Sequence, residues 1–350
     1  ADSPAPYRER NAQAGCEMLT TIAVDAMSGD HGALVCVPAC IRFLREHSDA
    51  RVLLVGDEKE LGRLAAGPAG LESRMDIVHA SQVVAMDDSA RDAVRHKKDS
   101  SMRVAIDLVK KGDASACVSA GNTGALMATA RFVLKTLPGI DRPAIISAIP
   151  AVGGHTHMLD LGANARCTAE QLFQFALMGS ITAQEVHRLE QPRVGLLNIG
   201  EEEIKGHEIV QEAAALVASS GLNYVGFVEG NDIFHGDVDV VVTDGFTGNV
   251  ALKTMEGVAK MIADLTREEL TRSLFTRLQG LTAMPALRSL KARLDPRRYN
   301  GATLVGLNGI VVKSHGGADE VAFCNALETA FLEAHTDLPA RISKLLQEQP

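Results

Sequence analysis

The sequence contains no tryptophan, only three tyrosines and no long run of uncharged apolar residues. A membrane-spanning helix needs roughly 18 apolar residues in succession, so the sequence predicts no membrane span. The pattern of basic and aromatic residues that is typical of nucleic-acid binding is also missing, and we expect no nucleic acid as a partner. Residues 1–20 lack the apolar core of a secretion signal and predict a disordered leader.

The six cysteines do not indicate a disulfide framework, because a chain of 350 residues with 46% apolar residues can bury a full core without one. Cys36 and Cys40 stand four residues apart on a predicted helix, and two thiols alone do not make a zinc site. Cys117 lies in an apolar run, where a thiol is usually inert. We therefore expect a cytoplasmic protein with reduced thiols, no metal and no cofactor.

Apolar runs that predict strands alternate with helical periodicity from Thr21 to Val242. Residues 51–55, for example, precede a predicted helix over 58–64, and residues 193–197 precede one over 207–218. This alternation is typical of a mostly parallel sheet with helices on both faces. We expect one large α/β domain over 21–345.

The pattern changes near residue 246. One long helix is predicted over 246–270, followed by two shorter helices over 273–281 and 285–294. Residues 267–298 carry eight basic and three acidic side chains, a net charge of +5, whereas the whole chain carries −9. Such a reversal favours an anionic partner. This basic amphipathic arm, 267–298, would therefore contact an anionic membrane surface or an acidic protein, or it would pair across a homodimer.

Six polar turns that contain glycine follow predicted strands: 25–32, 119–124, 160–164, 198–206, 244–249 and 315–319. Ligands of open α/β sheets bind outside the carboxyl ends of the strands. The six turns therefore predict the walls of one crevice.

The turn from Ser119 to Gly124 joins a predicted strand, 114–118, to a predicted helix, 125–134. Gly121 and Gly124 let the backbone approach a ligand closely. Side-chain donors are supplied by Ser119, Asn122 and Thr123. The first free N–H groups of the helix would point at the same place. The turn predicts a phosphate-binding site, although glycine and serine also occur in turns that only change the direction of the chain.

The six turns, in this order, resemble the PlsX family of bacterial phosphate acyltransferases of phospholipid synthesis. The resemblance runs from about Ile22 to about Leu332 and includes the segments 97–103, 119–127, 226–232 and 244–256. Ser28 is one departure, because the family usually has glycine there. The change removes no chemical group that the reaction needs.

The resemblance implies a three-layer α/β/α sandwich, similar to phosphotransacetylases and isocitrate-type dehydrogenases, in a homodimer. It also implies transfer of a long-chain acyl group from acyl carrier protein to inorganic phosphate. A membrane enzyme would use the acyl phosphate to acylate glycerol 3-phosphate, so we expect a cytoplasmic protein at the membrane periphery. Two alternatives stay open: a phosphotransacetylase-like enzyme that uses coenzyme A, and a non-catalytic membrane scaffold.

Phosphate is already a nucleophile, so such a site must hold it beside the thioester carbonyl and stabilise the oxyanion. Lys205 follows three glutamates at a predicted helix entry, where the helix dipole disfavours a cation. We expect Lys205 to bind phosphate or to polarise the thioester. Asn164 and Asn249 are neutral donors suited to the oxyanion, and His31 would protonate the departing thiolate.

Two further groups of polar residues complete the expected site. Ser100, Ser101 and Arg103 open another predicted helix and would hold the second side of the anion, unless the serines only cap the helix. Acidic groups stand at three strand ends, where they would orient Lys205 and His31 or transfer protons, or would only cap helices: Asp25, Asp160 and Asp244.

Overall fold

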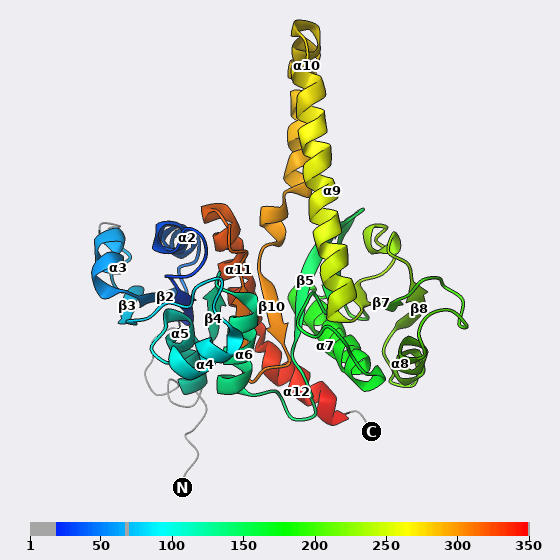
Figure 1. The fold of residues 1–350 in the computed structure, drawn as a ribbon, viewed down its shortest axis with the longest axis horizontal. Helices are drawn as coiled ribbons and strands as arrows, with labels where there is room; N and C mark the ends of the chain where they lie inside the picture. The colour runs from blue at the N-terminus through cyan, green and yellow to red at the C-terminus, as the bar shows by residue number, and fades with distance from the viewer. Residues whose placement is uncertain (1–18, 67–69, 349–350) are drawn as a thin grey trace.

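The computed structural model describes residues 19–66 and 70–348, and its strands form one sheet in the order β3-β2-β1-β4-β11-β10-β5-β6-β9-β7-β8 (Figure 1). The strands are β1 (Thr20–Asp25), β2 (Ala50–Gly56), β3 (Met75–His79), β4 (Ala116–Ser119), β5 (Ala144–Ala151), β6 (Gly154–Leu159), β7 (Val194–Leu197), β8 (Tyr224–Val228), β9 (Val240–Val242), β10 (Ala302–Val305) and β11 (Ile310–Lys313). The expected leader 1–20 lies outside the described residues as far as residue 18, and β1 begins at Thr20.

The sheet consists of two parallel blocks joined by antiparallel strands. Strands β3, β2, β1, β4 and β11 run parallel, and so do β6, β9, β7 and β8. Between the blocks, β10 and β5 make three antiparallel pairings. The prediction of a mostly parallel sheet is confirmed. Because three reversals separate the blocks, their strands point in opposite directions.

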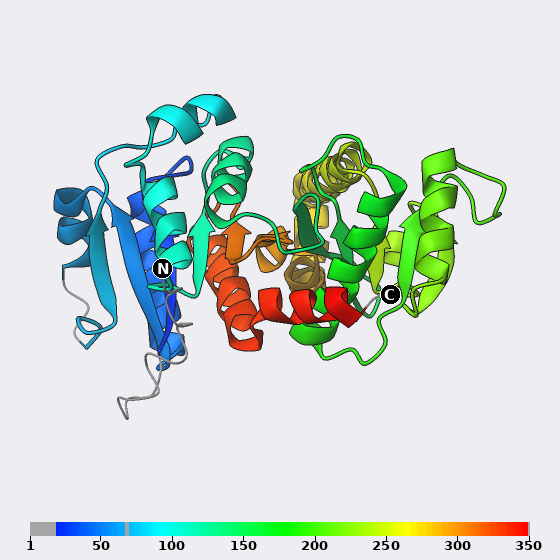
Figure 2. The ribbon, with the colours of Figure 1, turned by 90° about the horizontal axis from the view of Figure 1, so that it is seen from below.

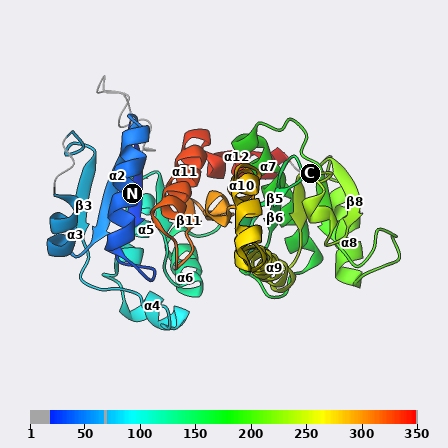
Figure 3. The ribbon, with the colours of Figure 1, turned by 90° about the horizontal axis from the view of Figure 1, so that it is seen from above.

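Helices cover both faces of the sheet, as expected. They are α2 (Ala33–Glu46), α3 (Glu58–Ala65), α4 (Ala90–His96), α5 (Ser101–Lys111), α6 (Thr123–Leu134), α7 (Ala169–His187), α8 (Glu208–Ala218), α9 (Gly245–Thr271), α10 (Leu274–Leu294), α11 (Glu320–Thr336) and α12 (Leu338–Glu348), with short 3₁₀ turns at Asp232–Phe234 and Pro296–Tyr299. Figure 3 shows α6 and α9 on one face and α11 and α12 on the other.

The alternation of strand side chains separates the core into layers. Ile22 and Val24 of β1 pack with residues of α2 and α11, whereas Ala23 between them faces a cluster built from α5, α6 and the base of α9. A third cluster joins α7, α8 and α12 to the second block. The face that carries α5, α6 and α9 is continuous across both blocks.

The chain from α9 to α10 forms a helical hairpin that protrudes from the body (Figure 1). The prediction of a long first helix is confirmed. The prediction of two shorter helices over 273–281 and 285–294 is wrong, since α10 is one helix with Pro285 inside it. A proline costs a helix one hydrogen bond, but α10 packs against α9, and tertiary packing often outweighs local propensity. None of the described helices is long and apolar enough to cross a bilayer.

Gly248 lets the first turn of α9 sit directly on the loop that follows β6. A Cβ atom there would lie 2.0 Å from the backbone oxygen of Asp160. Gly257, two turns further along the same helix, has open space around its Cα. We expect Gly248→Ala to lower the free energy of unfolding by about 1–3 kcal/mol, the usual cost of overpacking. Gly257→Ala should raise it by about 0.5–1 kcal/mol, because alanine is the better helix former. Thermal unfolding of the two variants side by side measures both effects, and equal midpoints would contradict the assigned contact.

Candidate active site

Three polar side chains stand side by side at the carboxyl ends of the central strands. Asp25 of β1 is in register with Ser119 of β4, and Ser119 is in register with Lys313 of β11. Residues in register on neighbouring parallel strands point to the same face, about 4.8 Å apart. A carboxyl group, a hydroxyl group and an ammonium group therefore form one row on the face covered by α5, α6 and α9.

Asp25 is fully buried at one end of this row. Its Oδ2 accepts a hydrogen bond of 2.6 Å from Ser119 Oγ, and Ser119 Oγ lies 3.3 Å from Ser28 Oγ. Burial raises the pKa of Asp25, and the hydrogen bonds of the surrounding serines only partly oppose this. Asp25 Oδ1 and Ser101 Oγ are buried without a hydrogen-bond partner among the described residues. Of the expected site residues, the structure thus brings Asp25, Ser119 and Ser101 together.

Lys313 is a site residue that the sequence analysis missed. Its half-buried ammonium group donates to the backbone oxygens of Ala120, at 3.4 Å, and of Ser314. The pKa of Lys313 is lowered to about 8, mainly by burial and in addition by the positive charge of Lys253 on α9, while Asp25 and Asp30 act in the opposite direction. The signal in the sequence was a lysine that ends an apolar strand just before one of the six selected turns. Only the strand register shows that it stands beside Ser119.

The first turn of α6 lies next to this row. Asn122 caps the helix by accepting from the backbone N–H of Ala125 at 2.9 Å. Thr123 and Gly124, the first two helical residues, are exposed, and their N–H groups belong to the first turn, which has no acceptors within the helix and forms the positive end of its dipole. A Cβ at Gly121 would lie 2.6 Å from Met102 Cε, so a larger residue there would require the end of the Met102 side chain to move. Such a helix start beside an ammonium group is a typical anion site.

The start of α5 differs from the expected anion clamp. Ser100 caps the helix, because its Oγ accepts from Arg103 N at 3.3 Å. The Arg103 side chain points elsewhere: Nε donates to Asp107 at 3.0 Å, and the guanidinium lies 5.4 Å from the ring centre of Phe132 on α6. The expectation that Ser100 and Arg103 hold the second side of the anion is therefore not supported by this arrangement. Of Ser100, Ser101 and Arg103, only Ser101 faces Asp25.

The turns after β1 and β11 are tied together above the row. Asp30 N donates to Gly316 O at 2.9 Å, and a Cβ at Gly317 would lie 3.2 Å from the Asp30 carboxylate. His315 Nδ1 accepts from Gly317 N at 3.1 Å, so this ring is held by its own turn. His31 is exposed one residue before the cap of α2. Three of the six selected turns thus form one group.

A second group forms at the ends of β6 and β9. Asp160 is fully buried and accepts from the backbone N–H groups of four residues, among them Asn164 at 2.6 Å. Burial still raises the pKa of Asp160. The amide nitrogen of Asn164 donates to Pro143 O and to Asp160, so both of its hydrogens are engaged. The expectation that Asn164 binds the oxyanion does not fit this geometry, since its side chain holds the turn.

At the start of α9, the predicted site residues of the second group also make contacts that stabilise the fold. Asp244 caps α9, accepting from the backbone N–H of Thr247 at 2.9 Å and from its hydroxyl at 2.7 Å. Of the roles considered for Asp244, the cap is the one observed. Asn249 is exposed and lies over Gly162. A Cβ atom at Gly162 would be 3.6 Å from the Cβ atom of Asn249.

Lys205 lies in a third place, in the loop between β7 and α8. Its ammonium forms an ion pair of 2.6 Å with Glu202, and this hydrogen bond is the main reason why the pKa of Lys205 is raised. Helix α8 begins at Glu208, three residues later. The unfavourable interaction of Lys205 with the helix dipole, from which we predicted a function, is therefore offset by the negative charge of Glu202. The prediction of one crevice with six walls becomes two groups of turns and a separate loop.

The two groups of turns are connected by α9. Its first residue lies against Asn164, since Gly245 N donates to Asn164 O at 2.8 Å. Two turns further, Lys253 is close enough to lower the pKa of Lys313 in the first group. Lys253 itself pairs with Glu256 at 2.8 Å. Helix α9, whose distal half leads into the arm, thus begins beside the candidate anion site.

Among the cysteines that the structure describes, Cys117 follows the expectation of an inert thiol. Cys117 is fully buried, and burial raises its pKa well above the usual range. Glu46, Cys324 and Glu328 bring possible ligand atoms within 4.8 Å of one another, the one such group in the described parts of the chain. Burial raises the pKa of Cys324 to about 11, so this thiol is protonated at neutral pH.

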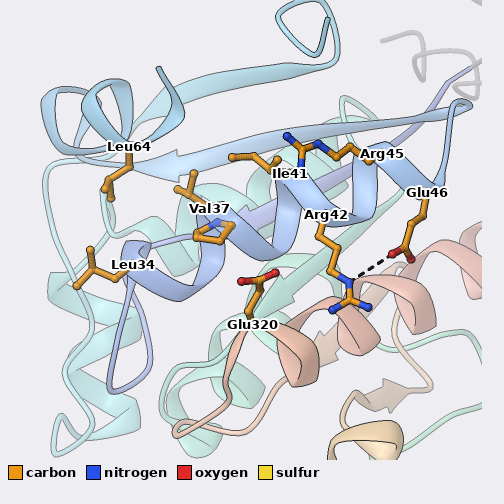
Figure 4. A pocket seen from close by; sticks show the side chains of 9 residues that line it. Leu34, Val37, Ile41, Arg42, Arg45, Glu46, Leu64 and Glu320 are labelled. Carbon is orange, nitrogen blue, oxygen red and sulfur yellow. Dashed lines mark hydrogen bonds and ion pairs between the residues drawn. The ribbon is translucent and has the colours of Figure 1, made fainter. Parts of the chain in front are cut away.

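A hollow of about 530 Å³ lies on the opposite face of the sheet, between α2, α3 and the start of α11 (Figure 4). Apolar side chains such as Val37 and Leu64 line it, together with the ion pair of Arg42 and Glu46 at 3.3 Å. Its charges are of both signs, with Arg45 and Glu320 at the rim. This hollow does not reach the row of Asp25 and its neighbours, which points to the other face.

Similar proteins agree with the fold. In solved structures, a phosphotransacetylase from Streptococcus pyogenes superposes with a TM-score of 0.62 at 16% identity, covering 91% of this chain and 96% of that one. The EutD phosphotransacetylase from Staphylococcus aureus gives a TM-score of 0.59 at 15% identity, covering 94% and 98%. The expected α/β architecture is thus confirmed.

Relatives in sequence are much closer. A protein of Methylococcus capsulatus named phosphate acyltransferase is 59% identical over 331 residues, which cover 94% of this chain and 98% of that protein. A protein of the same name from Alkalilimnicola ehrlichii is 60% identical over 328 residues, 93% of this chain and 96% of that protein. The model of the family described as fatty acid synthesis protein matches residues 20–341. The chain therefore belongs to this fatty acid synthesis protein family, the PlsX family that its six turns resemble.

Proposed function

We propose that this protein is a phosphate acyltransferase that moves a long-chain acyl group from the thioester of acyl carrier protein to inorganic phosphate. The observation that carries the proposal is the row of Asp25, Ser119 and Lys313 beside the exposed first turn of α6. The names of the relatives support phosphate as the acceptor. The acyl phosphate would serve the acylation of glycerol 3-phosphate in phospholipid synthesis.

Phosphate binds between the first turn of α6 and Lys313. The N–H groups of Thr123 and Gly124 and the ammonium group of Lys313 donate to its oxygens. The Asp25 carboxyl group accepts a hydrogen bond from Ser119, and its raised pKa limits repulsion of this anion. The backbone of Gly121 allows the close approach.

The reaction then needs few protein groups. A phosphate oxygen attacks the carbonyl carbon of the thioester, and the carbon–sulfur bond breaks with its electron pair on sulfur. The thiolate takes up one proton, which gives acyl phosphate and free thiol. His31 is exposed and supplies this proton in our proposal. The donors around phosphate also stabilise the negative charge that develops on the carbonyl oxygen.

The remaining predicted residues have less direct roles in this proposal. Asp160, Asn164 and Asp244 position the base of α9, and Asn249 lies over Gly162 in the second group of turns. Lys205 stays a predicted phosphate ligand whose ion pair with Glu202 would have to open.

Two further features of the proposal concern assembly and location. The exposed apolar side chains of the arm, such as Phe275 and Leu281, alternate with basic ones and fit the interface of an anionic membrane. We place the protein in the cytoplasm, as a homodimer that associates peripherally with the membrane. A carrier of the coenzyme A type remains the alternative donor, favoured by the fold likeness to phosphotransacetylases.

The first test is the reaction itself. Purified protein, acyl carrier protein loaded with a long acyl chain, and phosphate should yield acyl phosphate and free carrier protein. Substituting acyl coenzyme A for the carrier protein separates the two donors. Thiol release at the same rate without phosphate would identify a hydrolase and contradict the proposal.

Lys313→Ala should lower kcat/KM for phosphate by about 10²-fold, the scale for loss of one preorganised electrostatic contact. The pKa of Lys313 is about 8, so its ammonium is present below that pH and is lost as the pH rises through it. Wild-type kcat/KM should therefore fall above about pH 8. Lys313→Arg should move this fall to higher pH, because arginine stays charged.

Lys205→Ala, assayed in parallel, decides between the two lysines. A large loss with Lys205→Ala and none with Lys313→Ala would show that the phosphate site lies in the loop after β7. An unchanged pH profile in Lys313→Arg would also contradict the role of Lys313.

Phe275→Glu should abolish co-sedimentation of the protein with phosphatidylglycerol vesicles at low salt, while leaving turnover in solution intact. Phe275 is 69% exposed on α10, and each nearby basic residue contributes roughly 1 kcal/mol at an anionic surface. Ile209→Glu on α8, which also replaces an exposed apolar side chain, is the matched control. A Phe275→Glu variant that keeps vesicle binding, or that falls apart from dimer to monomer, would make the arm an assembly element.

A further inference from the structure

A basic groove lies between α4 and α6, on the same face of the sheet as the anion site. Its volume is about 630 Å³. Figure 2 shows the two helices side by side, with α4 in cyan and α6 in blue-green. Four cations line it from the two helices: Arg91, Arg95, Arg131 and Lys135. We define these residues, with Phe132, as the α4–α6 groove.

The charge of the groove is one-sided. All four cations are exposed, and none of them forms an ion pair with a carboxylate in the described parts of the chain. The groove lining contains no acidic residue, although the whole chain carries a net charge of −9. Four unpaired cations that converge on a hollow favour an anionic partner.

Phe132 adds an apolar anchor to the groove. It is 52% exposed, and two cations flank its ring: Arg103 at 5.4 Å and Lys135 Nζ at 4.9 Å from the ring centre. Exposed aromatic side chains and arginines are both enriched in protein–protein interfaces. A small free anion would make no use of such a ring.

The groove is connected to the anion site by the length of one helix. Helix α6 begins at Thr123 in the anion site, and Phe132 follows nine residues later, which is about 14 Å at 1.5 Å per residue. The loop that leads into α4 is fastened to the same site, because Asn122 Nδ2 donates to Met86 O at 2.6 Å. A partner held in the groove could therefore deliver a flexible prosthetic arm along α6 to the phosphate.

We propose that the α4–α6 groove is the docking surface for acyl carrier protein, the acidic protein that carries the thioester. This inference rests on the proposed function, because it names the partner's place beside the same site. Cations of the groove pair with acidic side chains of the carrier protein, and Phe132 packs against an apolar patch between them. The basic arm then remains available for the membrane.

The test combines direct binding with kinetics. Labelled acyl carrier protein is titrated with wild-type protein and with Arg95→Glu/Arg131→Glu, and anisotropy is followed at low salt. The double variant should bind at least tenfold more weakly and show a tenfold higher KM for acyl carrier protein. Its kcat and its KM for phosphate should stay unchanged, because neither arginine reaches the anion site. Lys59→Glu/Arg63→Glu on α3 changes the net charge equally on another part of the surface and should bind like wild type.

Several outcomes would overturn the inference. Unchanged affinity in the double variant, or equal loss in the α3 control, would show that the groove is not the docking surface. A change from dimer to monomer in light scattering would mean that a second copy of this chain fills the groove. If charge reversal lowers the unfolding midpoint, Arg95→Ala/Arg131→Ala replaces it, and the same weakening is required. The anisotropy titration measures binding without turnover. If binding depends on the groove arginines but the protein makes no acyl phosphate, the result would reject the proposed function and not the docking surface.

Discussion

The register of three central strands is the constraint on which the site depends. Because β4 pairs with β1 and with β11, Ser119 is fixed between Asp25 and Lys313. A buried carboxyl group or ammonium group alone would cost several kcal/mol. Here Asp25 is hydrogen-bonded to Ser119 and Lys313 to the backbone of Ala120. The same register places the turns that follow these strands, and with them the start of α6, so the proposed anion site is a consequence of the sheet.

The sequence was sufficient for the fold class and for the turns, because both are local. Alternation of apolar runs and helical periodicity predicts a mostly parallel sheet, and polar glycine turns mark the strand ends. The order of the strands is not local. The antiparallel pairings of β10 and β5 reverse the direction of the second block. The alternation of strands and helices along the sequence does not predict these pairings. The expected single crevice therefore became two groups, with Asp160 and Asn164 in the second.

The two lysines show the same limit at the level of single residues. Lys205 was predicted as a site residue because the helix dipole disfavours a cation at its position. Glu202, three residues before it, forms an ion pair with it. Lys313 looked ordinary, because a lysine at the end of an apolar strand is usually solvated. Its importance comes from neighbours far apart in the sequence: Asp25, Ser119 and, from α9, Lys253. Local anomalies are visible in a sequence, whereas a long-range convergence of charges needs the fold.

The position of α9 connects these long-range features to the two basic surfaces of an otherwise acidic chain. Its first turn is wedged against Asp160 through Gly248, its second part reaches Lys313 through Lys253, and its distal half leads into the arm. On the other side of the anion site, α6 runs from Thr123 to the α4–α6 groove. Donor and product in the proposed reaction need different surroundings, since a carrier protein is water-soluble and an acyl phosphate is amphiphilic. Helices α6 and α9 both lie beside the proposed anion site and lead to different surfaces. In the proposed reaction, the carrier protein would therefore bind at the surface beside α6, and the acyl phosphate would leave at the surface beside α9.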